Sequence, residues 1–466
     1  MNTGYHHRVQ RSTPILIGFT GAALLCVSAW LATPQPWGLG FAGRGNPVPV
    51  RWAHAGPAGL GAALLLVAWI MSAKCDVKAI WRRFTIWTMP LVACPPLLSK
   101  DVWAYLEQGW IVFRGYNPYE VALTSIGGPF GVFVDSYWQY TTTVYPPLAL
   151  QIQGLVVALT HSHRWMALLG MRVPGVIAVV AIGLMLPRIA RAVGMDEGRT
   201  LWLGLLNPLV LVHFIGGAHN DAWGIALAVT GLWIAVARPR AWVLGCVMVG
   251  LAMAIKQPLG LWLVPVALIG MKTEDIEPRQ MWADNWAPAL GRLAIGLGGV
   301  IIGFAVPTIT SGWGIGWAAG SGSPQSAGSQ SLAHTLSEVV HTVFPVSLPG
   351  AKSFVEPLIL LAGMVVIARL GWSLALAEPV GFGAWGLIVF ALAYPSLQPW
   401  YMLWGGVLLG AVMLGEHAIR WVIGAVAGFL VTSVSLDYAG WPIPVAQVLA
   451  LGLCWLLATR IEATRI

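Results

Sequence analysis

The chain has 466 residues, of which 57% are hydrophobic and only 9% are charged, whereas a soluble domain carries roughly 25% charged residues. Lys and Arg outnumber Asp and Glu by 26 to 18, but no basic patch interleaved with aromatic residues suggests nucleic-acid binding. The five cysteines form no CxxC pair, so neither a disulfide framework nor a zinc site is indicated. This composition predicts a membrane protein and excludes soluble enzymes, secreted disulfide scaffolds and nucleic-acid-binding proteins.

Fourteen stretches approach the length of about 20 apolar residues that a membrane helix needs, so the fold class expected is an all-α polytopic membrane protein formed as a single domain over residues 1–466. In chain order the predicted spans cover residues 14–33, 54–72, 85–98, 170–187, 200–215, 219–237, 241–256, 257–271, 291–308, 355–376, 380–395, 399–415, 419–435 and 441–459. A further apolar segment at 147–160 is short and ambiguous.

Positive charge decides how this ambiguous segment is interpreted. If residues 147–160 form an interfacial or re-entrant helix, 18 of the 26 Lys and Arg residues fall on the cytoplasmic side, and if they cross, only 10 do. The positive-inside rule therefore favours cytoplasmic N- and C-termini in a plasma-membrane protein. Two long segments, 99–144 and 309–354, then form outer loops, the second containing a Gly/Ser-rich stretch at 311–331.

The first outer loop begins with an amphipathic pattern. An apolar stripe runs along one side from Val102 to Phe113, while Asp101, Tyr105 and Gln108 share the other side, so the pattern predicts surface helices in this loop. A carboxylate at the bilayer boundary can take a proton from a substrate hydroxyl, and Asp101 is the first candidate for this role. The alternative is an acidic residue that interacts only with the helix dipole.

Three further groups of polar residues lie at predicted outer ends of spans. His219, Asn220 and Asp221 follow two glycines and offer hydrogen bonds to hydroxyls or a phosphate, although Asn220 or Asp221 could equally be a helix N-cap. Lys256 precedes a Gln-Pro pair and can meet a lipid phosphate or simply snorkel to the interface. The segment 394–401 places two prolines around polar residues and ends with an aromatic pair. That pair can form a platform for a sugar or prenyl group, or an aromatic belt anchor.

These motifs together resemble the actinobacterial polyprenol-phosphate-mannose-dependent α-1,6-mannosyltransferases, which are glycosyltransferases of the GT-C fold. The resemblance covers about residues 14–459 and is carried by six short motifs: residues 99–109, 115–119, 144–148 and 216–221, Lys256, and residues 398–401.

The resemblance implies inverting transfer of mannose from polyprenyl-phosphate mannose to a lipid-anchored α-1,6-mannan acceptor, the lipomannan or lipoarabinomannan backbone, outside the plasma membrane. It implies Asp101 as the catalytic base, with Glu107 in reserve, and no metal or other cofactor. The donor phosphate would be bound by Lys256 with Arg114 or Lys100. Sugar or acceptor contacts would come from the following residues: Tyr105, His219, Asn220, Asp221, Gln398, Trp400 and Tyr401.

Two alternatives remain open at this point. Another GT-C transferase using polyprenyl-phosphate arabinose or glucose would carry a similar base and similar phosphate ligands. A transporter or lipid-sugar flippase would place ionisable residues near the middle of its spans, whereas Asp101, Glu107, Asp221 and Lys256 fall near predicted outer ends. The pattern therefore favours an enzyme that works at the membrane surface.

Overall fold

The computed structural model describes residues 3–33, 48–271, 277–318 and 329–460, and within them every regular element is a helix. The described chain divides into two compact units. Unit 1 contains Met1–Val102, Asp196–His219 and Met413–Ile466, and unit 2 contains Trp103–Met195 and Asn220–Val412. The expected all-α polytopic fold class is confirmed.

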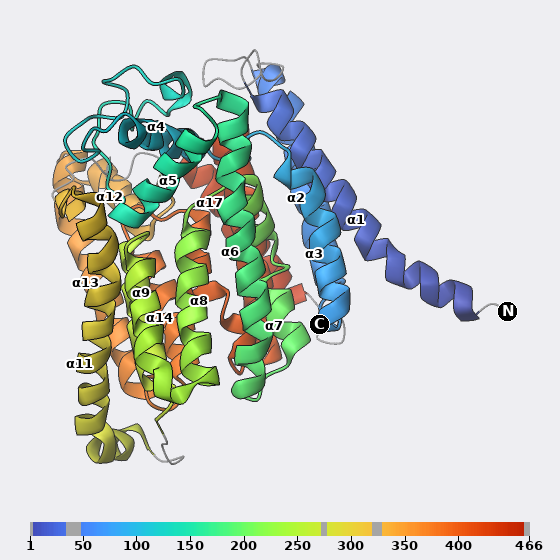
Figure 1. The fold of residues 1–466 in the computed structure, drawn as a ribbon. Coiled ribbons are helices and arrows are strands. Elements are labelled where there is room, and N and C mark those ends of the chain that lie inside the picture. The colour runs from blue at the N-terminus through green and yellow to red at the C-terminus, as the bar shows by residue number, and fades with distance from the viewer. Residues whose placement is uncertain (1–2, 34–47, 272–276, 319–328, 461–466) are drawn as a thin grey trace. The chain divides into compact units, whose positions relative to one another are not determined.

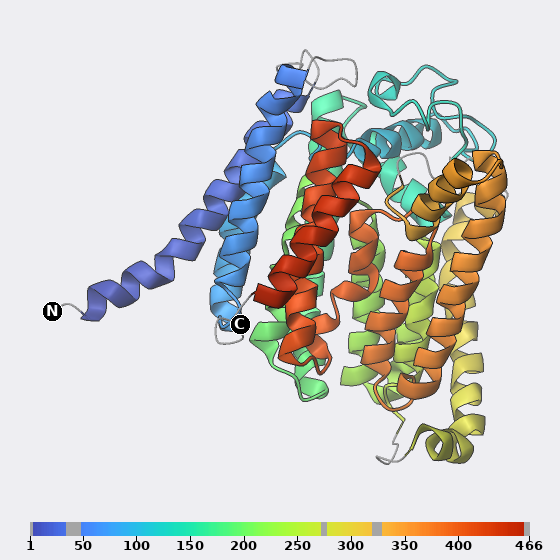
Figure 2. The same ribbon diagram turned by 180° about the vertical axis from the view of Figure 1, so that it is seen from behind.

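Unit 1 is built from long apolar helices that pair in sequence order. Helix α1 (Thr3–Ala32) packs along α2 (Val48–Ile70) and α3 (Val77–Val92), and α16 (Glu416–Val434) packs along α17 (Ile443–Arg460) (Figures 1 and 2). Three shorter helices complete the unit: α7 (Glu197–Gly204), η2 (Val210–Gly216) and η8 (Ser435–Ala439). Trp69 and Trp202 join α2 to α7 because each indole nitrogen donates to the other residue's carbonyl oxygen, at 2.8 and 2.7 Å.

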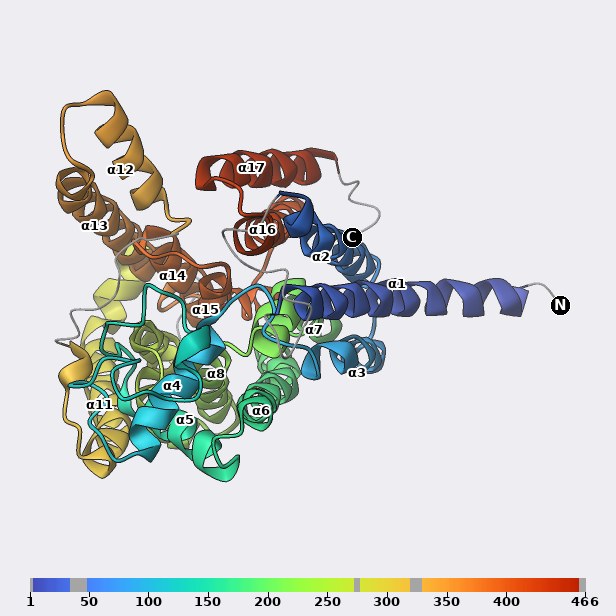
Figure 3. The ribbon, with the colours of Figure 1, turned by 90° about the horizontal axis from the view of Figure 1, so that it is seen from above.

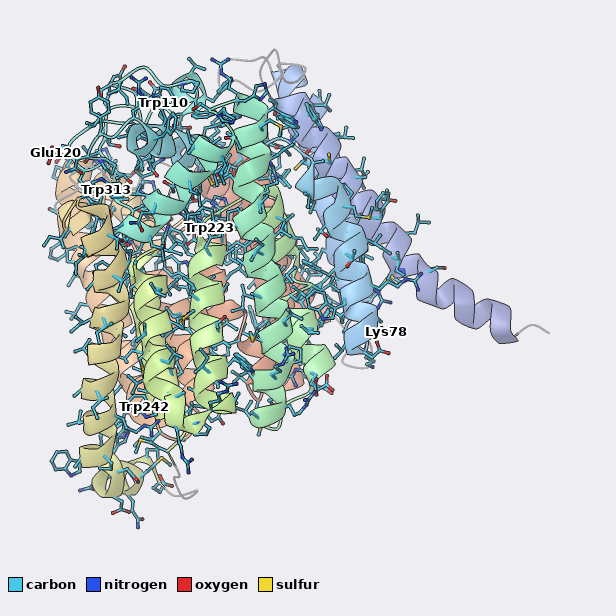
Figure 4. The ribbon with its side chains drawn as sticks, viewed as in Figure 1. Lys78, Trp110, Glu120, Trp223, Trp242 and Trp313 are labelled. Carbon is cyan, nitrogen blue, oxygen red and sulfur yellow. The ribbon has the colours of Figure 1, made fainter. Side chains whose placement is uncertain are left out.

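Unit 2 contains a bundle of upright helices with further helices across one end (Figure 1). The upright helices include α6 (Arg164–Ala192), α8 (Asp221–Ala237), α9 (Trp242–Met253), α11 (Pro278–Ser311), α13 (Leu348–Leu374) and α14 (Pro379–Ala393). Helices α4 (Asp101–Phe113), α5 (Pro147–Leu159) and α12 (Leu332–Val343) lie at one end of this bundle (Figures 1 and 3). Trp223 and Trp242 mark opposite ends of the α8–α9 hairpin, and Trp110 lies on α4 (Figure 4).

The remaining elements of unit 2 are short. They are α10 (Leu263–Leu268), α15 (Leu403–Gly406), η1 (Gly131–Phe133), η3 (Pro239–Ala241), η4 (Gln257–Trp262), η5 (Gly316–Ala318), η6 (Pro399–Met402) and η7 (Leu409–Ala411).

Small residues bring α9 and α11 into close contact. A side-chain carbon at Gly250 would lie 2.1 Å from the carbonyl oxygen of Val300, and one at Gly303 would lie 2.1 Å from that of Val247. Only glycine fits at either position, so the two backbones approach as in other membrane helix pairs that use small residues. Helix α13 instead presents exposed apolar side chains. Phe354, Leu361 and Val365 are each more than 60% exposed and suit contact with lipid.

The predicted count of fourteen spans is not confirmed. In the described residues seven helices are long and apolar enough to cross a membrane, or eight if the segments on either side of residues 217–220 form one broken span. Four shorter apolar helices accompany them: Pro147–Leu159, Pro239–Met253, Gln257–Leu268 and Pro379–Ala393. At 1.5 Å per residue a 13-residue helix such as α5 reaches about 20 Å, which is less than the hydrocarbon thickness of about 30 Å.

Two local predictions differ from the structure. The predicted span at 399–415 is three short helices, η6, α15 and η7, since Pro399 starts the first and glycines at 405, 406 and 410 weaken helix continuation. Helix α4 is buried on nearly every side from residue 102 to residue 109, because the loop that follows folds back and stacks Phe133 on Trp103 at 4.6 Å. Residues 319–328 of the Gly/Ser-rich stretch lie outside the described residues.

Candidate functional site

Asp101 and His219, which both belong to unit 1, lie side by side. Oδ2 of Asp101 lies 3.6 Å from Nδ1 of His219, and the aspartate side chain is 27% exposed whereas the histidine is fully buried. Ser99 Oγ accepts the backbone N–H of Asp101 at 3.2 Å at the start of α4. The carboxylate therefore has a defined partner in the His219 imidazole, and it also lies in the first turn of α4, where the helix dipole favours negative charge.

The backbone around Asp101 and His219 is held in an uncommon conformation. Leu98 and Ala218 both have left-handed φ values, 51° and 54°, which non-glycine residues rarely adopt. The Leu97 N–H donates to the Gly216 carbonyl oxygen at 3.3 Å, and a side chain at Gly216 would lie 2.7 Å from Leu97. The segment before Asp101 and the segment before His219 are thus joined by a backbone hydrogen bond.

Two residues that sequence reasoning missed lie behind His219. The N–H of His219 donates to the carbonyl oxygen of His213 at 3.2 Å, and the two imidazole rings are 5.8 Å apart. Nε2 of His213 lies 3.2 Å from Ser433 Oγ. His213 and Ser433 are both fully buried. Because 220 residues separate them, no local pattern could have predicted this contact.

Unit 2 contains the second group of predicted residues. Nζ of Lys256 lies 3.5 Å from Oδ1 of Asp221, which also accepts the indole N–H of Trp404 at 2.7 Å. Asp221 is fully buried and Lys256 is 8% exposed, so the ammonium neutralises a carboxylate inside the protein. The structure therefore brings together two residues that the sequence placed at the ends of different spans, and adds Trp404.

Aromatic rings surround the Lys256 ammonium. Nζ lies 4.9 Å from the ring centroids of both Tyr145 and Tyr401, a cation–π distance. Tyr401 stacks on Trp404 with ring centroids 4.3 Å apart. The Tyr145 hydroxyl donates to that of Tyr105 at 3.4 Å, so Tyr105, which is 1% exposed, lies behind Tyr145.

Helix ends place Tyr145 and Lys256 together. The first N–H groups of α5, on Leu148 and Ala149, donate to the carbonyl oxygen of Ala254 at 3.0 and 3.3 Å. Gln257 adds a side-chain hydrogen bond to the carbonyl oxygen of Val144 at 3.1 Å. Lys256 itself is extended and is the N-cap of η4, in which Pro258 occupies one of the first two positions. The sequence motif around Tyr145 thus has a structural role that its composition alone did not reveal.

Asn220 and Asp221 carry unused hydrogen-bonding groups. Asn220 is fully buried, and neither its amide nitrogen nor its amide oxygen has a hydrogen-bond partner. Oδ2 of Asp221 has none either. Asn220 stands at the N-cap of α8, but its side chain makes no capping hydrogen bond, so capping does not explain the residue. A buried amide and carboxylate oxygen with free capacity suit the hydroxyl groups of a ligand.

The loop before η6, the short helix that contains Tyr401, is held by residues 329–331. Hydroxyls of Ser329 and Ser331 both donate to the Pro395 carbonyl oxygen, at 2.6 and 2.7 Å, and the Gln330 N–H donates to that of Leu397. Of the other predicted residues in this loop, Gln398 is half-buried and accepts the Tyr401 N–H through its carbonyl oxygen, and Trp400 is 6% exposed with its ring 5.9 Å from that of Tyr401.

Glu107 holds the loop after α4 and is not accessible. Its side chain is fully buried, and its Oε2 accepts the backbone N–H of Phe130 at 3.1 Å. Burial raises its pKa to about 7, although nearby backbone N–H groups of Phe130, Gly128 and Gly131 oppose the shift. A pKa near 7 would suit a general base, so it is the burial of Glu107 and its bond to the loop that count against it in that role.

The two other predicted phosphate ligands are exposed. Lys100 lies at the surface next to Asp101, and Arg114 places its guanidinium 5.1 Å from the centroid of the Trp110 ring. Among the described residues no group of three or more His, Cys, Asp or Glu side chains is arranged to hold a metal ion.

Comparisons with known proteins agree with the resemblance seen in the motifs. An alpha-(1->6)-mannopyranosyltransferase of Mycobacterium tuberculosis is 27% identical over 85% of this chain and 78% of that protein. A probable alpha-(1->6)-mannopyranosyltransferase of Mycolicibacterium smegmatis is 28% identical over the same shares. Alpha-(1->6)-mannopyranosyltransferase A of M. tuberculosis is 25% identical over 88% of this chain and 82% of that protein. No solved structure matches.

The family model for the MptA_B family, described as alpha-(1->6)-mannopyranosyltransferase, N-terminal domain, matches residues 15–272. This match covers more than half of the chain and includes Asp101, His219, Asn220, Asp221 and Lys256. The chain belongs to the alpha-(1->6)-mannopyranosyltransferase family.

Proposed function

We propose that this protein transfers mannose from polyprenyl-phosphate mannose to an α-1,6-mannan acceptor, the backbone of lipomannan and lipoarabinomannan, on the outer face of the plasma membrane. Family membership supports mannosyl transfer. The lipid-linked donor agrees with the polytopic fold, because a prenyl tail needs an apolar environment and α13 offers lipid-facing apolar side chains. We further propose a GT-C fold with both chain termini in the cytoplasm.

The proposed reaction is a single displacement at the anomeric carbon. The acceptor hydroxyl oxygen forms a bond to C1, and the bond between C1 and the phosphate oxygen breaks, leaving its electron pair on polyprenyl phosphate. The hydroxyl proton moves to the Asp101 carboxylate. A β-linked donor therefore gives an α-linked product, and the two chemical needs are a base and a cation near the departing phosphate.

The exposure of three acidic side chains carries the choice of base. The Asp101 side chain is 27% exposed, whereas Glu107 and Asp221 are fully buried and already hold protein groups. A base must reach the proton that it removes, so Asp101 is the best placed of the three. Glu107 instead fastens the loop that covers α4.

The cation near the departing phosphate is assigned to a residue of unit 2. Lys256 supplies the cation, and its partner Asp221 keeps the ammonium in place in the absence of substrate. The unused groups of Asn220 and Asp221 are assigned to sugar hydroxyls, and Tyr401, whose half-buried ring stacks on the buried Trp404, to the apolar face of the sugar or the first prenyl unit.

The donor is tested with purified protein in proteoliposomes. Polyprenyl-phosphate mannose labelled in the sugar is supplied with an α-1,6-linked dimannoside acceptor, and GDP-mannose, polyprenyl-phosphate glucose and polyprenyl-phosphate arabinose are supplied in parallel. We expect transfer only from polyprenyl-phosphate mannose, and an α-1,6 linkage in the product.

Transfer from another polyprenyl-phosphate sugar would show a related transferase with a different donor, and transfer from GDP-mannose would contradict the lipid-linked donor. Movement of intact lipid-linked sugar between leaflets without transfer would show a flippase.

A further inference from the structure

The structure leaves one fully buried residue of the candidate site without a role in the proposed reaction. His219 was expected to orient sugar hydroxyls, yet its Nδ1 faces the Asp101 carboxylate at 3.6 Å. We propose that His219 is a positioning residue for Asp101: its Nδ1, 3.6 Å from Oδ2, attracts that oxygen and leaves Oδ1 for the acceptor hydroxyl. This inference rests on the proposed transferase function.

Contacts on both sides of His219 hold its backbone in place. Its backbone N–H is bonded to the carbonyl oxygen of His213, and the preceding residue, Ala218, is held in the left-handed region. Strain of this kind persists only where the surrounding structure enforces it. The backbone that carries the ring is therefore fixed independently of any ligand.

A second buried layer supports the first. The His213 ring packs 5.8 Å from that of His219, and its Nε2 contacts Ser433 Oγ, which in turn donates to the carbonyl oxygen of Phe429 at 2.8 Å. This series of groups leads from the partly exposed Asp101 into the interior of unit 1, through residues of η2 and α16. Such supporting contacts are what hold a general base in one orientation.

The contact between His219 and Oδ2 decides which oxygen of Asp101 receives the proton. With His219 beside Oδ2, the carboxylate is held in one orientation before transfer. During transfer the acceptor oxygen bonds to C1, polyprenyl phosphate departs with the electron pair, and the proton goes to Oδ1 of Asp101. Without His219 one contact that orients the carboxylate is lost, so a bound hydroxyl meets Oδ1 in a productive geometry less often.

Two amide substitutions separate positioning from simple loss of a buried ring. In His219→Asn the side-chain N–H₂ replaces Nδ1, whereas in His219→Gln it replaces the more distant Nε2. We expect His219→Gln and His219→Ala to lower kcat by about 10-fold or more, and by less than Asp101→Asn, with little change in KM for either substrate. His219→Asn should recover most of kcat. Trp69→Phe, a change at a buried ring of unit 1 whose indole bonds to Trp202, controls for lost packing and should leave kcat unchanged.

A double-mutant cycle shows whether His219 acts through Asp101. In the Asp101→Asn background, His219→Gln should cause no further loss, because the group that it positions is gone. Independent losses that multiply in the double variant, or equal activity of His219→Gln and wild type, would overturn the inference. If wild type itself transfers no mannose, the proposed function fails before this question is reached, so the two failures are distinguishable.

Discussion

Charge neutralisation at single residues explains how a polar site is tolerated inside a membrane protein. Asp221 and Lys256 lie 3.5 Å apart in an otherwise aromatic surrounding, and Asp221 also accepts the Trp404 indole N–H. Such a pair contributes modestly to stability as a whole, but removal of one partner leaves a buried charge that nothing compensates. In the reaction that we propose, the pair keeps a cation available for the donor phosphate at limited cost to the fold.

Lys256→Met tests this arrangement. Because Asp221 is left buried and unpaired, the variant should lose about 3–5 kcal/mol of stability and also lose transfer activity. The double variant Lys256→Met with Asp221→Asn should recover most of the stability, measured by thermal unfolding in detergent, but no transfer activity. Normal transfer by either variant would contradict the phosphate role of Lys256.

Glu107 predicts a pH dependence of stability. Its pKa in the folded protein is raised to about 7, so the folded protein keeps a proton that the unfolded chain releases near pH 4.5. Stability linked to Glu107 therefore falls as pH rises from about 4.5 to about 7. Glu107→Gln should remove this contribution, which thermal unfolding between pH 5 and pH 8 would register as a smaller decline in Tm, on the order of 1–3 °C. Identical pH profiles for the two proteins would show that Glu107 does not titrate in this range.

Individual elements were predicted from sequence to very different degrees. Long apolar runs such as Arg164–Ala192 were found directly, because length and hydropathy alone define a membrane helix. Segment 399–415 has the same composition but folds as three short helices, since packing outweighs hydropathy where backbones touch, as where a side chain at Gly405 would lie 2.1 Å from the Ala384 carbonyl oxygen.

Some residues of the candidate site were predicted from the sequence and others were not. Residues 219–221 and Lys256 were noticed because polar side chains are rare at the ends of apolar spans. Trp404, the partner of Asp221, and Ser433, the partner of His213, were not noticed, because they look like ordinary residues of apolar segments and become informative only through contacts across 183 and 220 residues. Local pattern thus identifies polar residues but not the residues that hold them.

The α9–α11 contact gives a prediction at the scale of elements. Gly303→Ala should separate the helices, since the added carbon would meet the Val247 carbonyl oxygen at 2.1 Å, and should cost about 1–3 kcal/mol of stability. Gly298→Ala on the same helix is the matched control, because no atom lies within 4 Å of the added carbon. Thermal unfolding compares the two variants, and equal stability would contradict the close packing of α9 on α11.

At the scale of the whole molecule, the orientation that we propose in the membrane rests on the distribution of charge. Tyr140 lies in the loop after α4 and is 85% exposed, and Arg240 is exposed in the short turn between α8 and α9. The positive-inside rule places the first outside and the second in the cytoplasm. In a chain without its five native cysteines, Tyr140→Cys should react with a membrane-impermeant thiol reagent in intact cells, and Arg240→Cys only after permeabilisation. The reverse labelling would invert the topology.

The most direct test of the account compares mannosyl transfer by wild type and Asp101→Asn. Both proteins are reconstituted at equal amounts with polyprenyl-phosphate mannose and an α-1,6-linked mannoside, and thermal unfolding confirms that both are folded. Wild type should form an α-1,6-linked product, and the variant should be slower by about 10²-fold or more, the scale expected for loss of a general base. A variant as fast as wild type would contradict the assignment of Asp101 as the base, and a folded wild type that forms no product would contradict the transferase itself.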